Sequence, residues 1–140
     1  MQIVRGRGPE TTPTQSRTET FTGTVWGDPV LPTTAEGNTV NSVTFTPGAR
    51  TYWHHHTHGQ LLVVTAGRGW VCTAGEPPQV IRAGDVVWVP PGERHWHGGT
   101  VDTIMTHLAV SLGPTVWSDE VDDDEYRAAL SAGAEGSSGR

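Results

Sequence analysis

Glycine and proline interrupt this chain so often that they limit what it can fold into. Its 18 Gly and 10 Pro residues recur throughout the sequence and leave only short segments between them. Both residues are unfavourable inside helices and strands and favourable in turns. The segments between them are rich in β-branched and aromatic residues and show no long helical period. This pattern indicates a protein made of short strands.

Eight or more segments of this kind follow one another at regular spacing. The run at 60–65 is apolar and ends in Ala-Gly, as expected of a buried strand. A series of short strands predicts an all-β barrel or sandwich. The strands are expected at Phe21–Trp26, Thr39–Phe45, Trp53–His56, Gln60–Thr65, Gly69–Thr73, Gln79–Arg82, Val86–Val89, His95–His97 and Thr103–Leu112.

The two ends of the chain differ from this central part, which we place at residues 21–118. Residues 1–20 are polar and contain two prolines, so we expect a flexible arm. Residues 119–130 begin with acidic side chains, which stabilise the N-terminus of a helix, and a short helix is expected there. Residues 131–140 have the composition of a disordered tail.

The composition argues against several classes of partner. The formal net charge is −6, and the nine basic residues are all Arg and are scattered, which disfavours nucleic acid and anionic membranes. There is no apolar run of about 18 residues, and the first residues lack the apolar stretch of a signal peptide. Cys72 is the only cysteine, so we expect a small buried residue, no intrachain disulfide and a cytoplasmic location.

All seven histidines lie between His54 and His107. His54 and His56 are two residues apart on an expected strand, which puts both rings on one face. Gln60 follows after a short interruption, and His95 comes just past a Pro-Pro-Gly turn. Three imidazoles and one amide oxygen can bind one divalent transition metal. The alternatives are exposed strand histidines or an expression tag, but this His run is internal and its spacing is shared by two strands.

The first histidine cluster resembles the first sequence motif of the cupin family. That motif is Gly, five residues, His-x-His, three or four residues, Glu, six residues and Gly. Gly48, His54, His56 and Gly67 fit it, and Gln60 stands in the place of Glu. A neutral ligand at this position would leave the full charge of the metal uncompensated.

The second cluster resembles the second cupin motif, which is Gly, five residues, Pro-x-Gly, two residues, His, three residues and Asn. Gly84, Pro90, Gly92 and His95 fit it, and Gly99 replaces Asn. The two motifs together agree at about eight positions over some fifty residues. The resemblance implies a double-stranded β-helix, or jelly roll, with a short C-terminal helix.

Residues 20–130 are similar to the small bacterial cupins that include manganese-dependent hydroxynitrile lyases, often labelled as carboxymuconolactone decarboxylase-related cupins. The resemblance implies that Mn²⁺ is the cofactor, with Fe²⁺, Ni²⁺ or Zn²⁺ as alternatives, and that the chain forms homodimers or homotetramers through N-terminal strand exchange. It also implies that His107 and His97 act near the substrate. The implied metal ligands are His54, His56, Gln60 and His95.

Strand parity identifies the other side chains that share the metal's side of the sheets. His97 lies two residues after His95, and a neutral imidazole there is suited to moving a proton. For His107 the alternative is a hydrogen-bonded core histidine, and His58 is not expected to be a ligand. On the strand at 39–45 parity alone does not fix the inner face, and we take the more apolar set as the inner one. The residues expected to line the substrate pocket are Asn41, Val43, Phe45, Met105, Ala109 and Ser111.

The opposite parity applies to Trp53 and Trp96, so we expect them on the outer face of the barrel, covered either by a partner subunit or by a second sheet with which they form a core.

Three functions remain open from the sequence. The first is a metal-dependent lyase that cleaves a hydroxynitrile, with the metal as Lewis acid and His107 as base. The second is an Fe-dependent dioxygenase or other oxygenase that uses the same site. The third is a non-catalytic cupin in which the metal anchors a bound small molecule. Thiol chemistry is disfavoured because Cys72 has no second cysteine to act with.

Overall fold

Strand β7 (Gln60–Thr73) organises the fold because it takes part in two curled antiparallel sheets. The computed structural model describes residues 1–6 and 8–136, with the backbone alone for 134–136. Gly67 lies where β7 passes from one sheet to the other, and its φ of 74° is in the left-handed region. A Cβ there would collide with the carbonyl oxygen of Ile104, so the crossing requires glycine.

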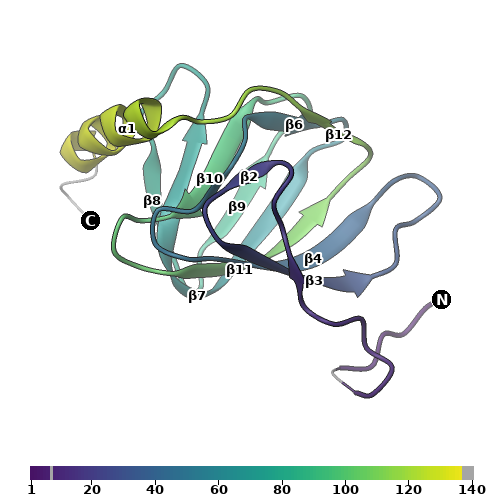
Figure 1. The fold of residues 1–140 in the computed structure, drawn as a ribbon. Coiled ribbons are helices and arrows are strands. Elements are labelled where there is room, and N and C mark those ends of the chain that lie inside the picture. The colour runs from purple at the N-terminus through teal and green to yellow at the C-terminus, as the bar shows by residue number, and fades with distance from the viewer. Residues whose placement is uncertain (7, 137–140) are drawn as a thin grey trace.

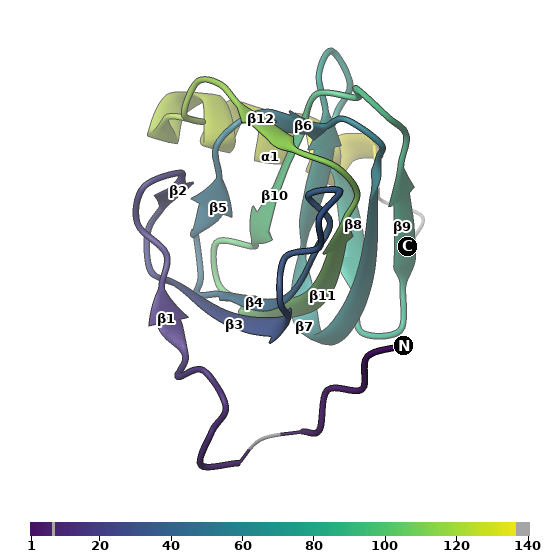
Figure 2. The same ribbon diagram turned by 90° about the vertical axis from the view of Figure 1, so that its right-hand side faces the viewer.

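The first sheet has the order β1-β3-β4-β11-β7, and β9 pairs with the first half of β7. In the second sheet β10 and β8 pair with the second half of β7, while β5 and β6 pair with β10. The two sheets curl toward each other as a half-barrel (Figures 1 and 2). The elements are β1 (Gln15–Ser16), β2 (Phe21–Thr22), β3 (Val25–Leu31), β4 (Thr39–Phe45), β5 (Arg50–Thr51), β6 (His54–His56), β7, β8 (Gln79–Arg82), β9 (Val86–Val89), β10 (His95–Gly99), β11 (Met105–Ser111), β12 (Thr115–Trp117) and α1 (Asp123–Gly136).

The expected all-β fold with one C-terminal helix is confirmed. The strand positions follow the prediction closely, although the stretches at 60–65 and 69–73 form one continuous strand. One apolar cluster lies between the two sheets and includes the fully buried side chains of Val25, Phe45 and Met105. Within the described residues, no helix is both long enough and apolar enough to cross a bilayer.

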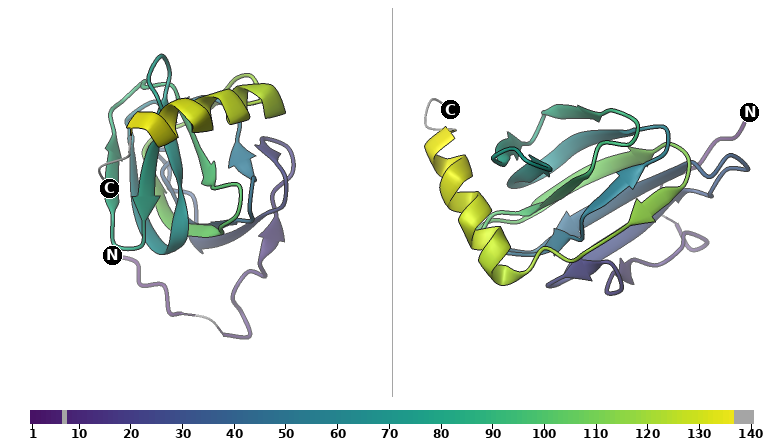
Figure 3. Two further views of the ribbon diagram at one scale, coloured as in Figure 1. Left: turned by 90° about the vertical axis from the view of Figure 1, so that its left-hand side faces the viewer. Right: turned by 90° about the horizontal axis from the view of Figure 1, so that it is seen from above.

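A second apolar cluster lies on the outer face of the second sheet, where α1 packs across it (Figure 3). Trp53 and Trp96 have the expected outward parity, but neither of the two expected coverings, a partner subunit or a second sheet, is what buries them. Both are buried in this cluster with Tyr126 of α1, so the chain's own helix shields them instead of a partner. Cys72 is buried there as predicted, and burial raises the pKa of its thiol to about 11.

Polar contacts fix the start of α1 on the barrel. The Nε and Nη2 atoms of Arg50 donate to the carbonyl oxygen of Val121 at 2.9 and 2.7 Å. The hydroxyl of Tyr126 donates to the Gly99 carbonyl oxygen at 2.7 Å. Asp122 caps the helix, since its carboxylate accepts the backbone N–H of Glu125 at 2.8 Å.

The boundaries at the two ends differ from those expected. The helix runs over 123–136 instead of 119–130, so residues 131–136 are helical and not disordered. Contact explains the extension, because Leu130 joins the outer cluster and Gly133 lies against Pro78. The rest of the expected tail, 137–140, lies outside the described residues. The arm at 1–20 contains the short strand β1, which pairs with β3.

Candidate metal centre

Three strands bring the four predicted metal ligands together between the sheets. Strand β6 carries His54 and His56 on its inner face, β7 begins with Gln60, and β10 begins with His95. His54 and His95 are directly opposite each other in the sheet, and their ring centroids are 4.3 Å apart. The His56 ring lies 5.0 Å from that of His54 and 5.6 Å from that of His95. All four side chains are buried.

Hydrogen bonds orient the ligand atoms toward the shared space. The Nδ1 atoms of His54 and His95 donate to the backbone carbonyls of Tyr52 and Glu93, at 2.8 and 2.9 Å. A carbonyl can only accept, so in the neutral rings the proton is on Nδ1 and the lone pair is on Nε2. The His56 Nδ1 atom lies 3.0 Å from the Thr115 hydroxyl.

Gln60 supplies the strongest indication of a cation. Its Nε2 donates to the hydroxyl of Ser111 at 3.0 Å, which turns Oε1 toward the imidazoles. That Oε1 lies 3.0 Å from His95 Nε2, although both atoms carry lone pairs when His95 is neutral. The Nε2 atom of His56 is also buried without a hydrogen-bond partner. A metal ion would satisfy all three atoms, so these residues fit the expected metal.

Burial keeps these imidazoles neutral and therefore able to coordinate a metal. It lowers the pKa of His56 to about 4, and it lowers the pKa of His95 from its usual value. Burial lowers the pKa of His54 further below its usual range, with a smaller contribution from the neighbouring His95.

The structure adds His97 to the possible ligand set. The ring nitrogens of His54, His95 and His97 approach within 4.8 Å of one another, which is close enough to share one metal. The sequence prediction gave His97 a catalytic role instead. Its spacing from His95 showed that it shares the metal's face, but spacing does not show how near the metal it lies.

His97 also contacts His107, the other histidine expected to act near the substrate. The Nε2 atom of His107 lies 3.0 Å from Nδ1 of His97, and Phe45 packs against both rings. The remaining nitrogens, His97 Nε2 and His107 Nδ1, are buried without hydrogen-bond partners. Burial lowers the pKa of His107 to about 4 and holds the pKa of His97 well below its usual range. The pair is therefore neutral at pH 7.

The six residues expected to line the substrate pocket lie on paired positions of β4 and β11. Met105 is opposite Phe45 and Ala109 is opposite Asn41. Phe45 and Met105 are fully buried in the core between the sheets, and Ser111 contacts Gln60 as described above. The contact of these residues with substrate stays a prediction.

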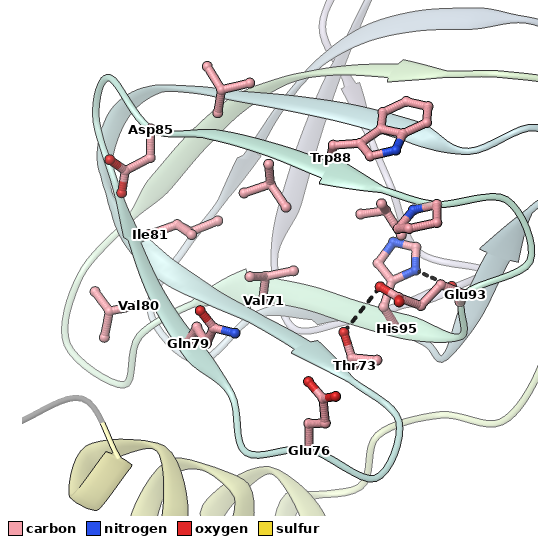
Figure 4. Close-up of a pocket in the computed structure, with 14 residues that line it drawn as sticks. Val71, Thr73, Glu76, Gln79, Val80, Ile81, Asp85, Trp88, Glu93 and His95 are labelled. Carbon is pink, nitrogen blue, oxygen red and sulfur yellow. Dashed lines mark hydrogen bonds between the residues drawn. The ribbon is translucent and has the colours of Figure 1, made fainter.

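Sequence reasoning missed a cavity on the other side of the site. It has a volume of about 590 Å³ and reaches His95 from between β8 and β9 (Figure 4). None of the six predicted pocket residues lines it. The sequence shows that β9 is an apolar strand. It does not show that β8 and β9 pair with different halves of β7 and so lie apart. The other two histidines, His55 and His58, are half-buried and exposed, in agreement with their exclusion from the site.

Comparison with known proteins agrees with this description. The Cupin domain family model matches residues 41–111. A protein of Granulicella tundricola named (R)-mandelonitrile lyase is 50% identical over 115 residues, which cover 76% of this chain and 86% of that protein.

Solved structures give the same result. A cupin-like protein of Thermotoga maritima has a TM-score of 0.77 and 38% identity, over 86% of this chain and 94% of its own. The polyketide cyclase RemF of Streptomyces resistomycificus shares the fold, with a TM-score of 0.69 at 15% identity over 92% of this chain and 94% of its own. The motif match, the half-barrel and these relatives together show that the chain belongs to the cupin family.

Proposed function

We propose that this protein is a metal-dependent lyase that cleaves an aromatic hydroxynitrile into an aldehyde and hydrogen cyanide. The observation that carries the proposal is the neutral His97–His107 pair beside the buried ligand cluster. The 50% identity to a protein named (R)-mandelonitrile lyase supports this choice of reaction. The metal ligands in this proposal are His54, His56, Gln60 and His95, and Mn²⁺ is the metal.

A metal bound there would supply a Lewis acid for the substrate's hydroxyl oxygen. His107 accepts the hydroxyl proton at Nδ1, an atom that has no other partner. The Nε2–H of His107 then donates to Nδ1 of His97 across the 3.0 Å contact. The C–CN bond breaks with its electron pair on cyanide, and His97 Nε2–H protonates the cyanide. One proton enters the pair and one leaves it, so the pair stays neutral. General acid–base catalysis of this kind contributes roughly 10²–10⁴-fold.

The test is to load purified protein with Mn²⁺ and to follow benzaldehyde release from mandelonitrile by absorbance. We expect turnover well above that of free Mn²⁺ in the same buffer. Equal rates with and without protein would refute the lyase. Oxygen uptake by the anaerobically prepared Fe²⁺ form would then point to the oxygenase, and inactivity of both forms would point to a binding protein.

We further propose that the chain forms a homo-oligomer and resides in the cytoplasm. The outer face of the first sheet carries exposed or half-buried apolar side chains, including Trp26, Leu108 and Val110. Such a face is stabilised when a second copy covers it. The cytoplasmic location rests on Cys72, whose buried, unpaired thiol suits a reducing compartment.

A further inference from the structure

The cavity that reaches His95 has a structural origin in the pairing of β7. β8 pairs with β7 over 68–71, and β9 pairs with it over 60–63. The two strands follow one another in the chain but bind to different halves of β7, so they diverge with the sheets. The space between them is the 590 Å³ cavity, which is within the range of small-molecule sites.

Apolar side chains form one part of the cavity lining, and polar side chains, including Thr73 and Gln79, form the rest. Val71, Ile81, Val87 and Val89 line the cavity, and the first three also pack against the core cluster between the sheets. Trp88 lies at the rim with about half of its surface exposed (Figure 4). Its indole ring packs over Gly59, where a Cβ would come within 2.7 Å of the ring, so the aromatic face is held in place. This apolar part of the lining suits an aromatic ring.

The charged side chains that line the cavity are all acidic. Glu76, Asp85 and Glu93 line it, and no Arg is among the described residues that do. The Glu93 carboxylate accepts a hydrogen bond from the Thr73 hydroxyl at 3.3 Å, and that of Asp85 accepts the Arg82 backbone N–H at 2.8 Å. Carboxylates in the lining repel an anion that enters the cavity.

We propose that this cavity is the subsite for the aromatic ring of the substrate and that it excludes anionic aromatic compounds. The inference rests on the proposed function for the reaction at His95, but the binding of the ring does not depend on turnover. The ligand is then a small aromatic molecule without negative charge, whose reactive group points toward the metal ligands.

The binding test uses metal-free ¹⁵N-labelled protein and three probes that differ mainly in charge at pH 7, namely benzylamine, benzyl alcohol and benzoate. We expect benzylamine and benzyl alcohol to shift the backbone resonances of Val71 and Val87 and the indole N–H of Trp88, which Trp88→Phe identifies. Benzoate should bind at least roughly threefold more weakly than benzyl alcohol, as expected for partly solvated charges. Equal affinity for benzoate, or shifts confined to Asn41 and Ala109, would overturn the proposal.

Two sets of variants separate charge from shape. Glu76→Gln with Glu93→Gln should raise the affinity for benzoate roughly three- to tenfold, because two carboxylates lose their charge. The exposed pair Glu19→Gln with Glu36→Gln is the control and should leave it unchanged. Val71→Phe should abolish binding by filling the cavity, whereas Val101→Phe, at an exposed site, should not. If Val71→Phe does not fold, Trp88→Ala tests the same cavity by removing the aromatic ring at its rim.

The outcomes for the cavity and for the lyase are distinguishable. Probe binding at the cavity without release of benzaldehyde would support the cavity as a site for an aromatic ring and refute the lyase activity. Val71→Phe could instead turn over mandelonitrile with the same KM as the unaltered protein. That result would support the lyase activity and refute the cavity as its substrate subsite.

Discussion

The Nε2 atom of His107 lies 3.0 Å from Nδ1 of His97, and this contact links the tautomers of the two rings. If His97 Nδ1 accepts, His107 has a free lone pair at Nδ1 and can act as a base. If His97 instead binds a metal through Nε2, its proton moves to Nδ1, and His107 must carry its own proton on Nδ1. His97 therefore cannot ligate the metal while His107 serves as the base.

The first prediction follows from this exclusion. His107→Ala should retain the metal and the fold but lose roughly 10²-fold or more in kcat for mandelonitrile, as expected when a general base is removed. His55→Ala is the matched control, because His55 lies on the same strand as the metal ligands with the opposite parity. A His107→Ala protein with undiminished kcat would show that another group takes the proton.

The second prediction concerns the metal. We expect about one transition metal per chain, and a loss of most of it in His54→Ala with His56→Ala. Elemental analysis after dialysis measures this directly. His97→Ala should keep its metal if His97 belongs to the proton-transfer pair. Metal loss in His97→Ala and normal loading in His56→Ala would assign the site to His54, His95 and His97 instead.

The sequence predicted that these four side chains lie close together, because the spacing within each cupin motif is short-range; their binding of a metal stays a prediction. The two-residue step from His54 to His56 depends only on strand parity, and Gly67 is required where β7 changes sheets. Contacts between distant segments were harder to predict. Parity placed Trp53 on the outer face, but nothing local indicated that Tyr126, far along the chain, would cover it. The cavity beside His95 likewise depends on how two sheets diverge.

The third prediction uses the pKa of His107, which burial lowers from 6.5 to about 4. Between these values the unfolded chain binds a proton that the folded chain does not. The free energy of unfolding should therefore fall as the pH drops from 6.5 toward 4, and His107 should contribute roughly 3 kcal/mol of that loss. Urea denaturation of metal-free protein measures it. His107→Gln should flatten the pH dependence, and an unchanged slope would contradict the assignment.

The fourth prediction concerns the attachment of α1. Tyr126→Phe removes the hydroxyl that donates to the Gly99 carbonyl at 2.7 Å. The buried carbonyl then lacks this partner, and the free energy of unfolding should fall by about 1–2 kcal/mol. Arg127→Ala alters an exposed neighbour on the same helix and should have a much smaller effect. Equal stability of Tyr126→Phe and the unaltered protein would mean that water replaces the hydroxyl without loss.

The last prediction concerns assembly. Leu108 lies on the outer face of the first sheet, because its neighbours His107 and Ala109 point inward. If a second copy covers this face, Leu108→Glu places a charge in an apolar interface, where its desolvation is unfavourable. Light scattering should then give the mass of a dimer or tetramer for the unaltered protein and of a monomer for Leu108→Glu. Val116→Glu, on the exposed strand β12, is the control and should not change the mass. A monomeric mass for the unaltered protein at micromolar concentration would refute the proposed oligomer.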